Sequence, residues 1–351
     1  MAPKRFHGLD GLRGVCALSV VLLHADNLFR PGSLLQHGFL AVDMFFLLSG
    51  FVIALNYQAA LEKGLGLLPF LEMRGRRLLP VFWLGAAFNL AIFIWMASSG
   101  YYQGGYGWVT IWLLMPLLTL LMVPAFGMPG GGFSPPLLHV SWSLMVEWLV
   151  NAAYARWLFS CRTRTLMWIA ALGWLVMTVA CYFTGRGWCV GNGRVDVFTY
   201  GLLRGVADFS AGVVISRLHA RNAFAKLPAV APEILLLLWL CIAVVPTPGA
   251  TPTFDAIAVI LLCPLLVVML IRSEHKTPAF AKALGALSYP LYVVHPGIIL
   301  LAQFTPVFGL NQGPRPLRAA VVLALCIAAA WLLNAVTAKR RPKALALTKS
   351  A

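Results

Sequence analysis

Residues 9–28, LDGLRGVCALSVVLLHADNL, have almost the length and composition of a membrane span, yet they carry Arg13 and His24. Ionisable side chains are costly at membrane depth, so they mark candidate functional sites that face a polar cavity. The two residues are eleven positions apart, which at about 100° per residue places both on one helix face, roughly 16 Å apart. We therefore predict that Arg13 and His24 line one cavity. The alternatives are that Arg13 snorkels to the interface and that His24 is a packing histidine.

The composition extends this interpretation to the whole chain. Of 351 residues, 60% are hydrophobic and 11% charged, and the mean hydropathy is +0.83, as expected of a polytopic membrane protein. Apolar runs recur from end to end, so we expect a single integral-membrane domain over residues 1–351, with a basic cytoplasmic tail at 338–351. The net charge of +16 indicates loops retained in the cytoplasm, and we expect no nucleic-acid partner.

The distribution of basic loops limits the number of spans. About eleven runs are apolar enough to cross a bilayer, but that many spans would put both Arg162–Arg164 and the basic tail outside. If the run near 108–124, bracketed by glycines and prolines, is a re-entrant or interfacial helix, about ten spans remain and both termini are cytoplasmic. The alternative is that this run spans and the positive-inside rule fails locally.

The cysteines predict neither metal binding nor redox chemistry. The chain has seven cysteines, without the spacing of a metal site. Pairing of Cys181 with Cys189 across one loop is the alternative for those two residues.

The second span begins with GFLAVDMFFLLSGF and places Asp43 near its outer end. A short loop makes this span the antiparallel neighbour of the first, so Asp43 and His24 are expected at similar depth. A carboxylate that holds one imidazole nitrogen makes the other a stronger base toward a hydroxyl. The competing interpretation is that Asp43 caps its own helix.

Three later stretches carry further polar residues that are candidates for a functional site. In FLEMRGRRLLP, Arg74 and Arg77 share a face if the segment is helical, and guanidinium groups suit phosphate, although topology signalling alone also produces such clusters. HVSWSLMVEWLV places Glu147 inside a membrane helix, as part of a site or of a structural ion pair. In LGALSYPLYVVHPGIIL, Tyr292 and His295 are about one turn apart.

Another pair is expected to be structural. Arg204 and Asp208 are four positions apart and predicted to bridge within their own helix.

Together these stretches resemble acyltransferase family 3, integral-membrane enzymes that acylate cell-surface and secreted molecules with acyl-CoA. The resemblance covers about residues 6–300, with a family-like core to about 337. It rests on five motifs in order: LDGLRG with R-x10-H, GFLAVDMFFLLSGF, F-x3-RxxR from Phe70, WSLxxE from Trp142, and LGALSYPLYVVHP. The family often has an acidic residue and Pro-Phe after its last span, whereas this chain has TAKRRPKAL. The resemblance implies a ten-span, stand-alone acyltransferase without a fused hydrolase-like domain.

The acyl group is expected to pass from acyl-CoA in the cytoplasm to an acceptor at the outer face of the membrane. Arg13, Arg74 and Arg77 would hold the phosphates of cytoplasmic acyl-CoA, a co-substrate with acetyl as the family's common acyl group. The thioester would reach His24, which acts as general base, oriented by Asp43, or is itself transiently acylated. The resemblance also makes Arg13 a catalytic candidate, Glu147 is a further one, and the substrate-side candidates are Trp142, Ser143, Tyr292 and His295.

The expected acceptor is a hydroxyl of a cell-envelope carbohydrate or related molecule, and the expected location is a bacterial inner membrane. No permanently bound cofactor is expected. The alternative class is a secondary transporter that uses the intramembrane charges, although the chain shows no repeated halves.

Overall fold

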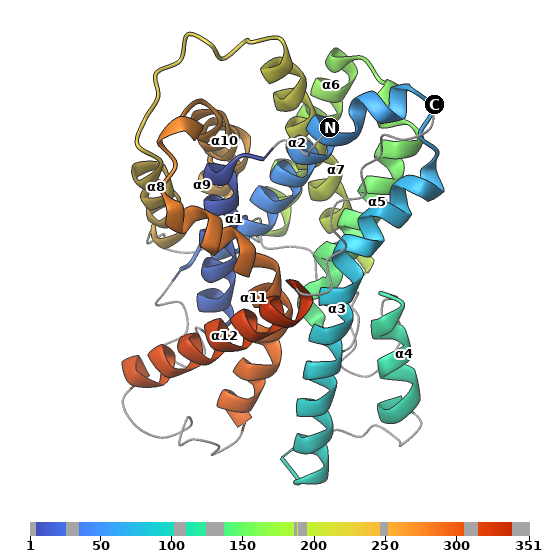
Figure 1. The fold of residues 1–351 in the computed structure, drawn as a ribbon, viewed down its shortest axis with the longest axis vertical. Helices are drawn as coiled ribbons and strands as arrows, with labels where there is room; N and C mark the ends of the chain where they lie inside the picture. Colours follow the sequence, from blue (N-terminus) through green and yellow to red (C-terminus); the bar gives the residue numbers. More distant parts are fainter. Residues whose placement is uncertain are drawn as a thin grey trace.

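The computed structural model describes residues 5–25, 35–101, 110–123, 137–185, 188, 195–245, 252–304 and 315–338. All regular elements in these segments are helices (Figure 1). In chain order they are α1 (His7–His24), η2 (Gly38–Leu40), α2 (Ala41–Glu62), α3 (Leu67–Ser98), η3 (Thr110–Leu114), α4 (Met115–Leu120), η4 (His139–Ser141), α5 (Trp142–Arg156), η5 (Leu158–Ser160), α6 (Thr163–Thr184), α7 (Val195–Ala220), α8 (Pro232–Val244), α9 (Pro252–Ile257), η6 (Ala258–Leu262), α10 (Cys263–Arg272), η7 (Glu274–Lys276), α11 (Ala279–Phe304) and α12 (Arg315–Ala338).

Among the described residues, 6 helices are long and apolar enough to cross a membrane. They are Gly38–Glu62, Leu67–Ser98, Thr163–Thr184, Pro252–Arg272, Ala279–Gln303 and Leu317–Thr337. The all-helical, multi-pass architecture predicted from the sequence is confirmed. The remaining predicted spans correspond to α1, α5, α7 and α8. Of these, α5 and α8 are short, and α1 and α7 carry several charged residues, so the count of about ten spans stays a prediction.

The run near 108–124 forms a short helix in its described part. A five-residue π turn, η3, leads into α4, which has 6 residues. At about 1.5 Å per residue this piece covers roughly half of the hydrocarbon core. It lies beside α3 in Figure 1. Residues 108, 109 and 124 of this run lie outside the described residues, so the re-entrant or interfacial helix stays a prediction.

Glycines allow two pairs of helices to pack backbone to backbone. A Cβ atom on Gly14 of α1 would lie 2.6 Å from backbone and side-chain atoms of Leu284 in α11. Facing it, Gly285 of α11 leaves room for Asp10 of α1. In the same way Gly50 of α2 touches the backbone of Phe209 in α7. Small residues of this kind permit close helix contacts in membranes, and here they fix α1 against α11 and α2 against α7.

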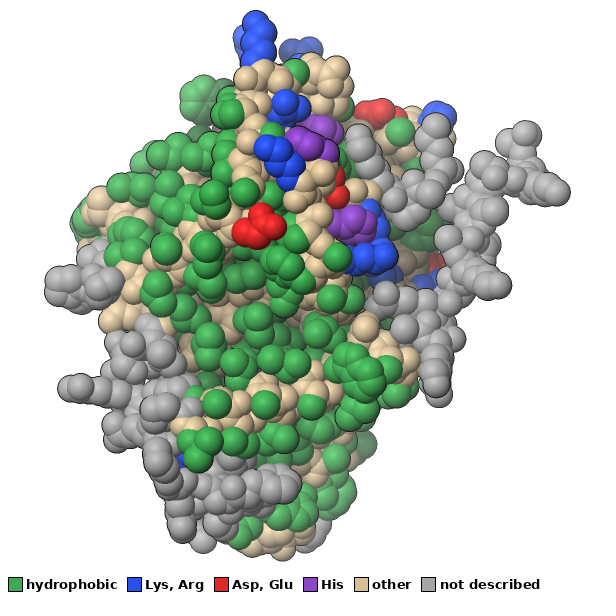
Figure 2. All heavy atoms as spheres, turned by 60° about the vertical axis from the view of Figure 1, so that its left-hand side comes forward, with side chains coloured by type: hydrophobic (Ala, Val, Ile, Leu, Met, Phe, Trp, Pro, Cys, Tyr) green, Lys and Arg blue, Asp and Glu red, His purple; other side chains and the backbone are tan. Residues whose placement is uncertain are grey.

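The outer surface matches a protein surrounded by lipid. Large apolar side chains remain exposed along α6, α8 and α12, among them Trp168, Ile234 and Trp331. On the face drawn in Figure 2, hydrophobic side chains cover most of the surface, and most Lys, Arg and His side chains gather toward its upper part.

Candidate functional site

The contact between α1 and α11, here called the α1–α11 seam, positions Arg13. Its guanidinium group donates from Nε to Ser288 Oγ at 3.0 Å and from Nη2 to Gly285 O at 3.2 Å. Nη2 also donates to Asp10 Oδ1 at 3.0 Å, one turn earlier on α1. Two of these partners are on α11, so the approach permitted by Gly14 and Gly285 places the arginine. These partners of Arg13 were not predicted from the sequence.

His24 lies at the other end of the same seam, next to His295 of α11. His24 Nδ1 is 2.9 Å from Val20 O and 3.3 Å from His295 Nε2. A carbonyl oxygen only accepts, so the hydrogen of His24 is on Nδ1 and the basic lone pair is on Nε2. His295 repeats this arrangement, with Nδ1 3.1 Å from Leu291 O. Arg13 and His24 thus both face α11, which confirms the predicted shared face.

Tyr292 extends the histidine pair, His24 and His295, toward α5. Its ring lies 5.8 Å from that of His295. The hydroxyl of Tyr292 is 2.7 Å from Ser143 Oγ and donates to Val140 O at 2.8 Å. Three of the predicted substrate-side residues, Ser143, Tyr292 and His295, therefore lie together and are buried. The fourth, Trp142, faces another way, with its ring 5.9 Å from the guanidinium carbon of Arg204.

Glu147 of α5 connects this helix to α2 and α3 through hydrogen bonds. Arg74 Nη2 of α3 donates to Glu147 Oε1 at 3.3 Å, and Ser49 Oγ of α2 donates to the same oxygen at 2.8 Å. Arg74 is buried, and its Nε atom has no hydrogen-bond partner among the described residues. Glu147 thus takes part in an ion pair that fixes the direction of Arg74, which was one of the two interpretations of its sequence position.

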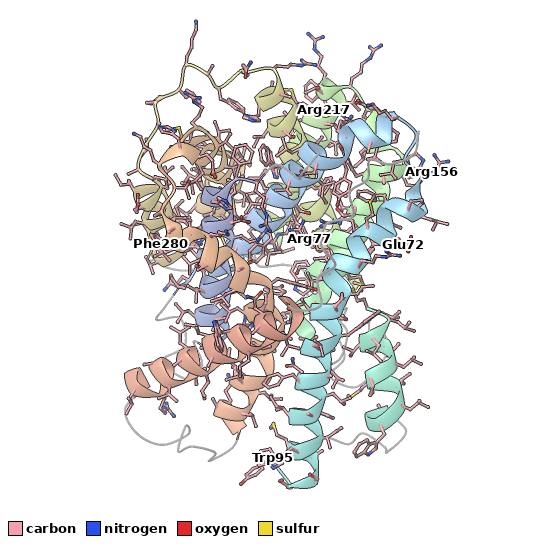
Figure 3. All side chains as sticks on the ribbon, viewed as in Figure 1. Glu72, Arg77, Trp95, Arg156, Arg217 and Phe280 are labelled. Carbon is pink, nitrogen blue, oxygen red and sulfur yellow. The ribbon has the colours of Figure 1, made fainter. Side chains whose placement is uncertain are left out.

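Arg77 lies near these charges without being held by them. Its charge interacts with those of Arg74 and Arg13, and its side chain is exposed. Within the described part of the chain it forms no hydrogen bond or ion pair. In Figure 3, Arg77 and Glu72 lie on opposite sides of α3, with Arg77 on the side of α2 and α11. The three predicted donor-binding arginines therefore form one cluster of positive charge.

Asp43 does not orient His24, and this prediction was wrong. Its carboxylate accepts two hydrogen bonds from Arg204 of α7, Nε to Oδ1 at 2.8 Å and Nη2 to Oδ2 at 2.5 Å. Trp188 Nε1 donates to Oδ1 at 3.1 Å. The reason is the packing of α2 against α7 through Gly50, which turns Asp43 toward α7 and away from α1.

The predicted bridge between Arg204 and Asp208 was also wrong. Arg204 pairs with Asp43, whereas Asp208 Oδ1 accepts a hydrogen bond from Trp174 Nε1 at 2.8 Å. A bidentate carboxylate on a facing helix satisfies the guanidinium group better than a residue one turn along the same helix.

The sequence analysis missed His37, Asp255 and Trp188, which extend this ionic network. His37 Nδ1 lies 2.7 Å from Asp255 Oδ1, and the backbone N–H of Trp188 donates to Asp255 Oδ2 at 2.9 Å. All three side chains are buried. Asp255 stands at the start of the apolar run 255–271, and a carboxylate at that place was the available signal. Cys189, the alternative partner of Cys181, lies outside the described residues, as does the tail at 339–351.

Comparisons with known proteins identify the family of the chain. A family model described as an acyltransferase domain matches residues 6–335. The chain is 36% identical over 190 residues to protein 2 in the picA locus of Rhizobium radiobacter, covering 51% of this chain and 95% of that protein. It is 26% identical over 334 residues to the exopolysaccharide production protein ExoZ of Rhizobium meliloti, covering 93% and 97%.

A shorter match links the chain to a protein named for its reaction. Over 81 residues it is 33% identical to the O-acetyltransferase OatA of Staphylococcus aureus, covering 22% of this chain and 13% of that protein. No solved structure matches the chain.

Proposed function

Since the chain belongs to acyltransferase family 3 and is a multi-pass membrane acyltransferase, we propose that it transfers an acetyl group from acetyl-CoA to a hydroxyl of a cell-envelope carbohydrate. The donor would bind from the cytoplasm and the enzyme would reside in a bacterial inner membrane. A relative of nearly the same length is named for exopolysaccharide production, and another relative is named an O-acetyltransferase, which supports this acceptor class and this acyl group.

The observation that carries the proposal is the α1–α11 seam, which has Arg13 at one end and His24 at the other. The nucleotide phosphates of the donor would meet Arg13, Arg74 and Arg77. These residues lie in a cluster of positive charge. The pantetheine arm would then reach from these arginines toward His24, beside the close contact of α1 with α11, over the roughly 16 Å that separates positions 13 and 24 of one helix.

His24 acts as the general base in this scheme. Its Nε2 atom takes the proton of the acceptor hydroxyl, the acceptor oxygen attacks the thioester carbonyl carbon, and the carbon–sulfur bond breaks. The CoA thiolate then takes up the proton held by His24. Because Nδ1–H points at Val20 O, and His295 Nε2 lies 3.3 Å from it, both stabilise the imidazolium that forms. General-base catalysis of this kind contributes about 10²- to 10⁴-fold.

Glu147 has a positioning role in this proposal. Its carboxylate receives hydrogen bonds from Arg74 and Ser49, so its charge is used to hold a donor-binding arginine. Ser143, Tyr292 and His295 would form the acceptor side, since His295 contacts His24, the Tyr292 ring lies next to that of His295, and the Ser143 hydroxyl bonds to that of Tyr292.

The test separates binding from transfer. Purified protein is given radiolabelled acetyl-CoA and envelope carbohydrate, and His24→Gln is compared with the wild type. We expect transfer to fall by about 10²- to 10⁴-fold while the Kd for acetyl-CoA changes little. Retained transfer would remove His24 from the mechanism. An acetylated protein trapped in the wild type would favour transfer through an acyl-histidine.

A further inference from the structure

A second cluster of arginines surrounds a pocket at the start of α6. The pocket has a volume of about 790 Å³, within the range of small-molecule binding sites. It lies among the ends of α2, α5, α6 and α7. Its lining includes four arginines and one glutamate: Arg162, Arg164, Arg217, Arg221 and Glu62.

One of these arginines builds the wall of the pocket. Arg217 Nη1 donates to Cys161 O at 2.6 Å and its Nη2 donates to Phe159 O at 2.7 Å. These bonds fasten the turn between α5 and α6 to α7. Gln58 of α2 also donates to Phe159 O, at 2.9 Å, and to Glu62 Oε1 at 2.5 Å. Glu62, the single acidic side chain of the lining, thus already accepts a hydrogen bond.

The other three arginines are available to a ligand. In the described segments, the side chains of Arg162, Arg164 and Arg221 form no hydrogen bond or ion pair, and all three residues are exposed. The backbone adds to their charge. Helix α6 begins at Thr163 without a side-chain cap, so the first N–H groups of this 22-residue helix point into the region of Arg162 and Arg164. A helix N-terminus next to guanidinium groups is a binding environment for phosphate.

The surroundings of the pocket are those of a membrane interface. Beyond Arg164, helix α6 presents Met167 and Trp168 to the outside, with 53% and 75% of their surface exposed. Trp157, on the other side of the turn, is 61% exposed. Exposed tryptophans beside an apolar helix face are typical of the headgroup level of a bilayer. A phosphate bound at Arg162 and Arg164 could therefore belong to a lipid whose chains lie along α6.

The pocket is separate from the cluster of Arg13, Arg74 and Arg77. Tyr57 of α2 packs edge-on against Phe70 of α3, with ring centroids 5.2 Å apart, and its hydroxyl is close enough to Arg77 to interact with that charge. The next residue, Gln58, faces the pocket. Neighbouring positions on a helix differ by about 100° in direction, so α2 stands between the two groups of arginines.

We propose that this pocket binds the phosphate headgroup of an anionic phospholipid in the leaflet that contacts the start of α6. The lipid phosphate would form ion pairs with Arg162, Arg164 and Arg221, whose side chains have no partner among the described residues. The same phosphate chemistry is present in CoA, so the experiment includes both sources.

The experiment measures thermal unfolding of the purified full chain in a neutral detergent, with short-chain phosphatidylglycerol or phosphatidylcholine added. The variant is Arg162→Gln/Arg164→Gln/Arg221→Gln. None of these side chains has a partner in the described structure, so the fold should persist. The matched control, Lys226→Gln/Lys276→Gln/Lys282→Gln, removes the same charge from exposed positions outside the pocket.

We expect phosphatidylglycerol, and not phosphatidylcholine, to raise the Tm of the wild type and of the control. The concentration needed should rise on the order of tenfold or more in the pocket variant. The Kd for acetyl-CoA should be the same in all three proteins. Equal responses of the three proteins to phosphatidylglycerol would overturn the proposal, as would a loss of acetyl-CoA binding, which would assign the phosphate to the donor.

Discussion

At the scale of single residues, Asp43 illustrates how a buried charged side chain can stabilise the fold without binding a substrate. Asp43 is 1% exposed and forms a bidentate ion pair with Arg204, itself 2% exposed. Removing one partner of such a pair leaves an uncompensated buried charge, and this typically costs about 3–5 kcal/mol. The geometry therefore assigns Asp43 to stability.

We predict that Asp43→Asn lowers the free energy of unfolding by about 3–5 kcal/mol, because Arg204 loses its charged partner. Thermal unfolding in detergent measures this loss directly. Transfer activity per folded molecule should remain within a few fold of the wild type. A variant that unfolds like the wild type but transfers no acetyl group would return Asp43 to the catalytic mechanism.

The residues predicted correctly are those whose relation depends on a single helix. Arg13 and His24 share a face because both belong to α1, and helical geometry alone fixes that. The partner of Asp43 lies 161 positions later in the chain, and no spacing rule reaches that far. A similar depth in the membrane says nothing about the direction in which a side chain leaves its helix.

At the scale of helices, close packing at glycines positions the polar groups of the seam. We predict that Gly14→Ala destabilises the protein by about 1–3 kcal/mol, because the new Cβ would lie 2.6 Å from the Leu284 backbone. Arg13 and His24 would shift with the helix. The readouts are Tm and transfer rate.

Gly66→Ala is the matched control for this prediction. The nearest atom to its new Cβ would be in the Pro69 side chain at 3.5 Å, an ordinary contact. Equal Tm values for the two variants would contradict the role assigned to the close contact of α1 with α11.

A second prediction for helix contacts concerns α5 and α11. The hydroxyls of Ser143 and Tyr292 lie 2.7 Å apart between these helices. A double-mutant cycle with Ser143→Ala and Tyr292→Phe should give a coupling energy of about 0.5–1.5 kcal/mol in unfolding, because each single change already removes the bond. Strict additivity would mean that the two hydroxyls do not interact in the folded protein.

At the scale of the whole molecule, hydropathy predicted the all-helical, multi-pass class but not the arrangement of the helices. Whether the run near 108–124 spans the membrane depends on the charge argument alone and stays a prediction. The pairing of α2 with α7 could not be predicted, since glycines that permit close contacts do not identify the helix they will meet. The ionic network of His37, Asp255 and Trp188 depends on that arrangement and was missed with it.

The whole-molecule account is that donor phosphates bind at one end of the α1–α11 seam and the acyl group is transferred at the other. Substitution of Arg77 tests the donor-binding part of this account most directly. It is exposed and forms no ion pair among the described residues, so its replacement leaves no buried charge behind. Arg76 is the matched control, because it is the preceding residue, is exposed and pairs with Glu72.

The deciding measurement is acetyl-CoA binding to the purified protein by titration calorimetry, for the wild type, Arg77→Gln and Arg76→Gln. A charge-assisted contact to phosphate contributes about 1.5–3 kcal/mol, so the Kd should rise by on the order of tenfold to a hundredfold in Arg77→Gln and remain unchanged in Arg76→Gln. Equal Kd values for all three proteins, or no binding by well-folded wild type, would contradict the proposed donor site.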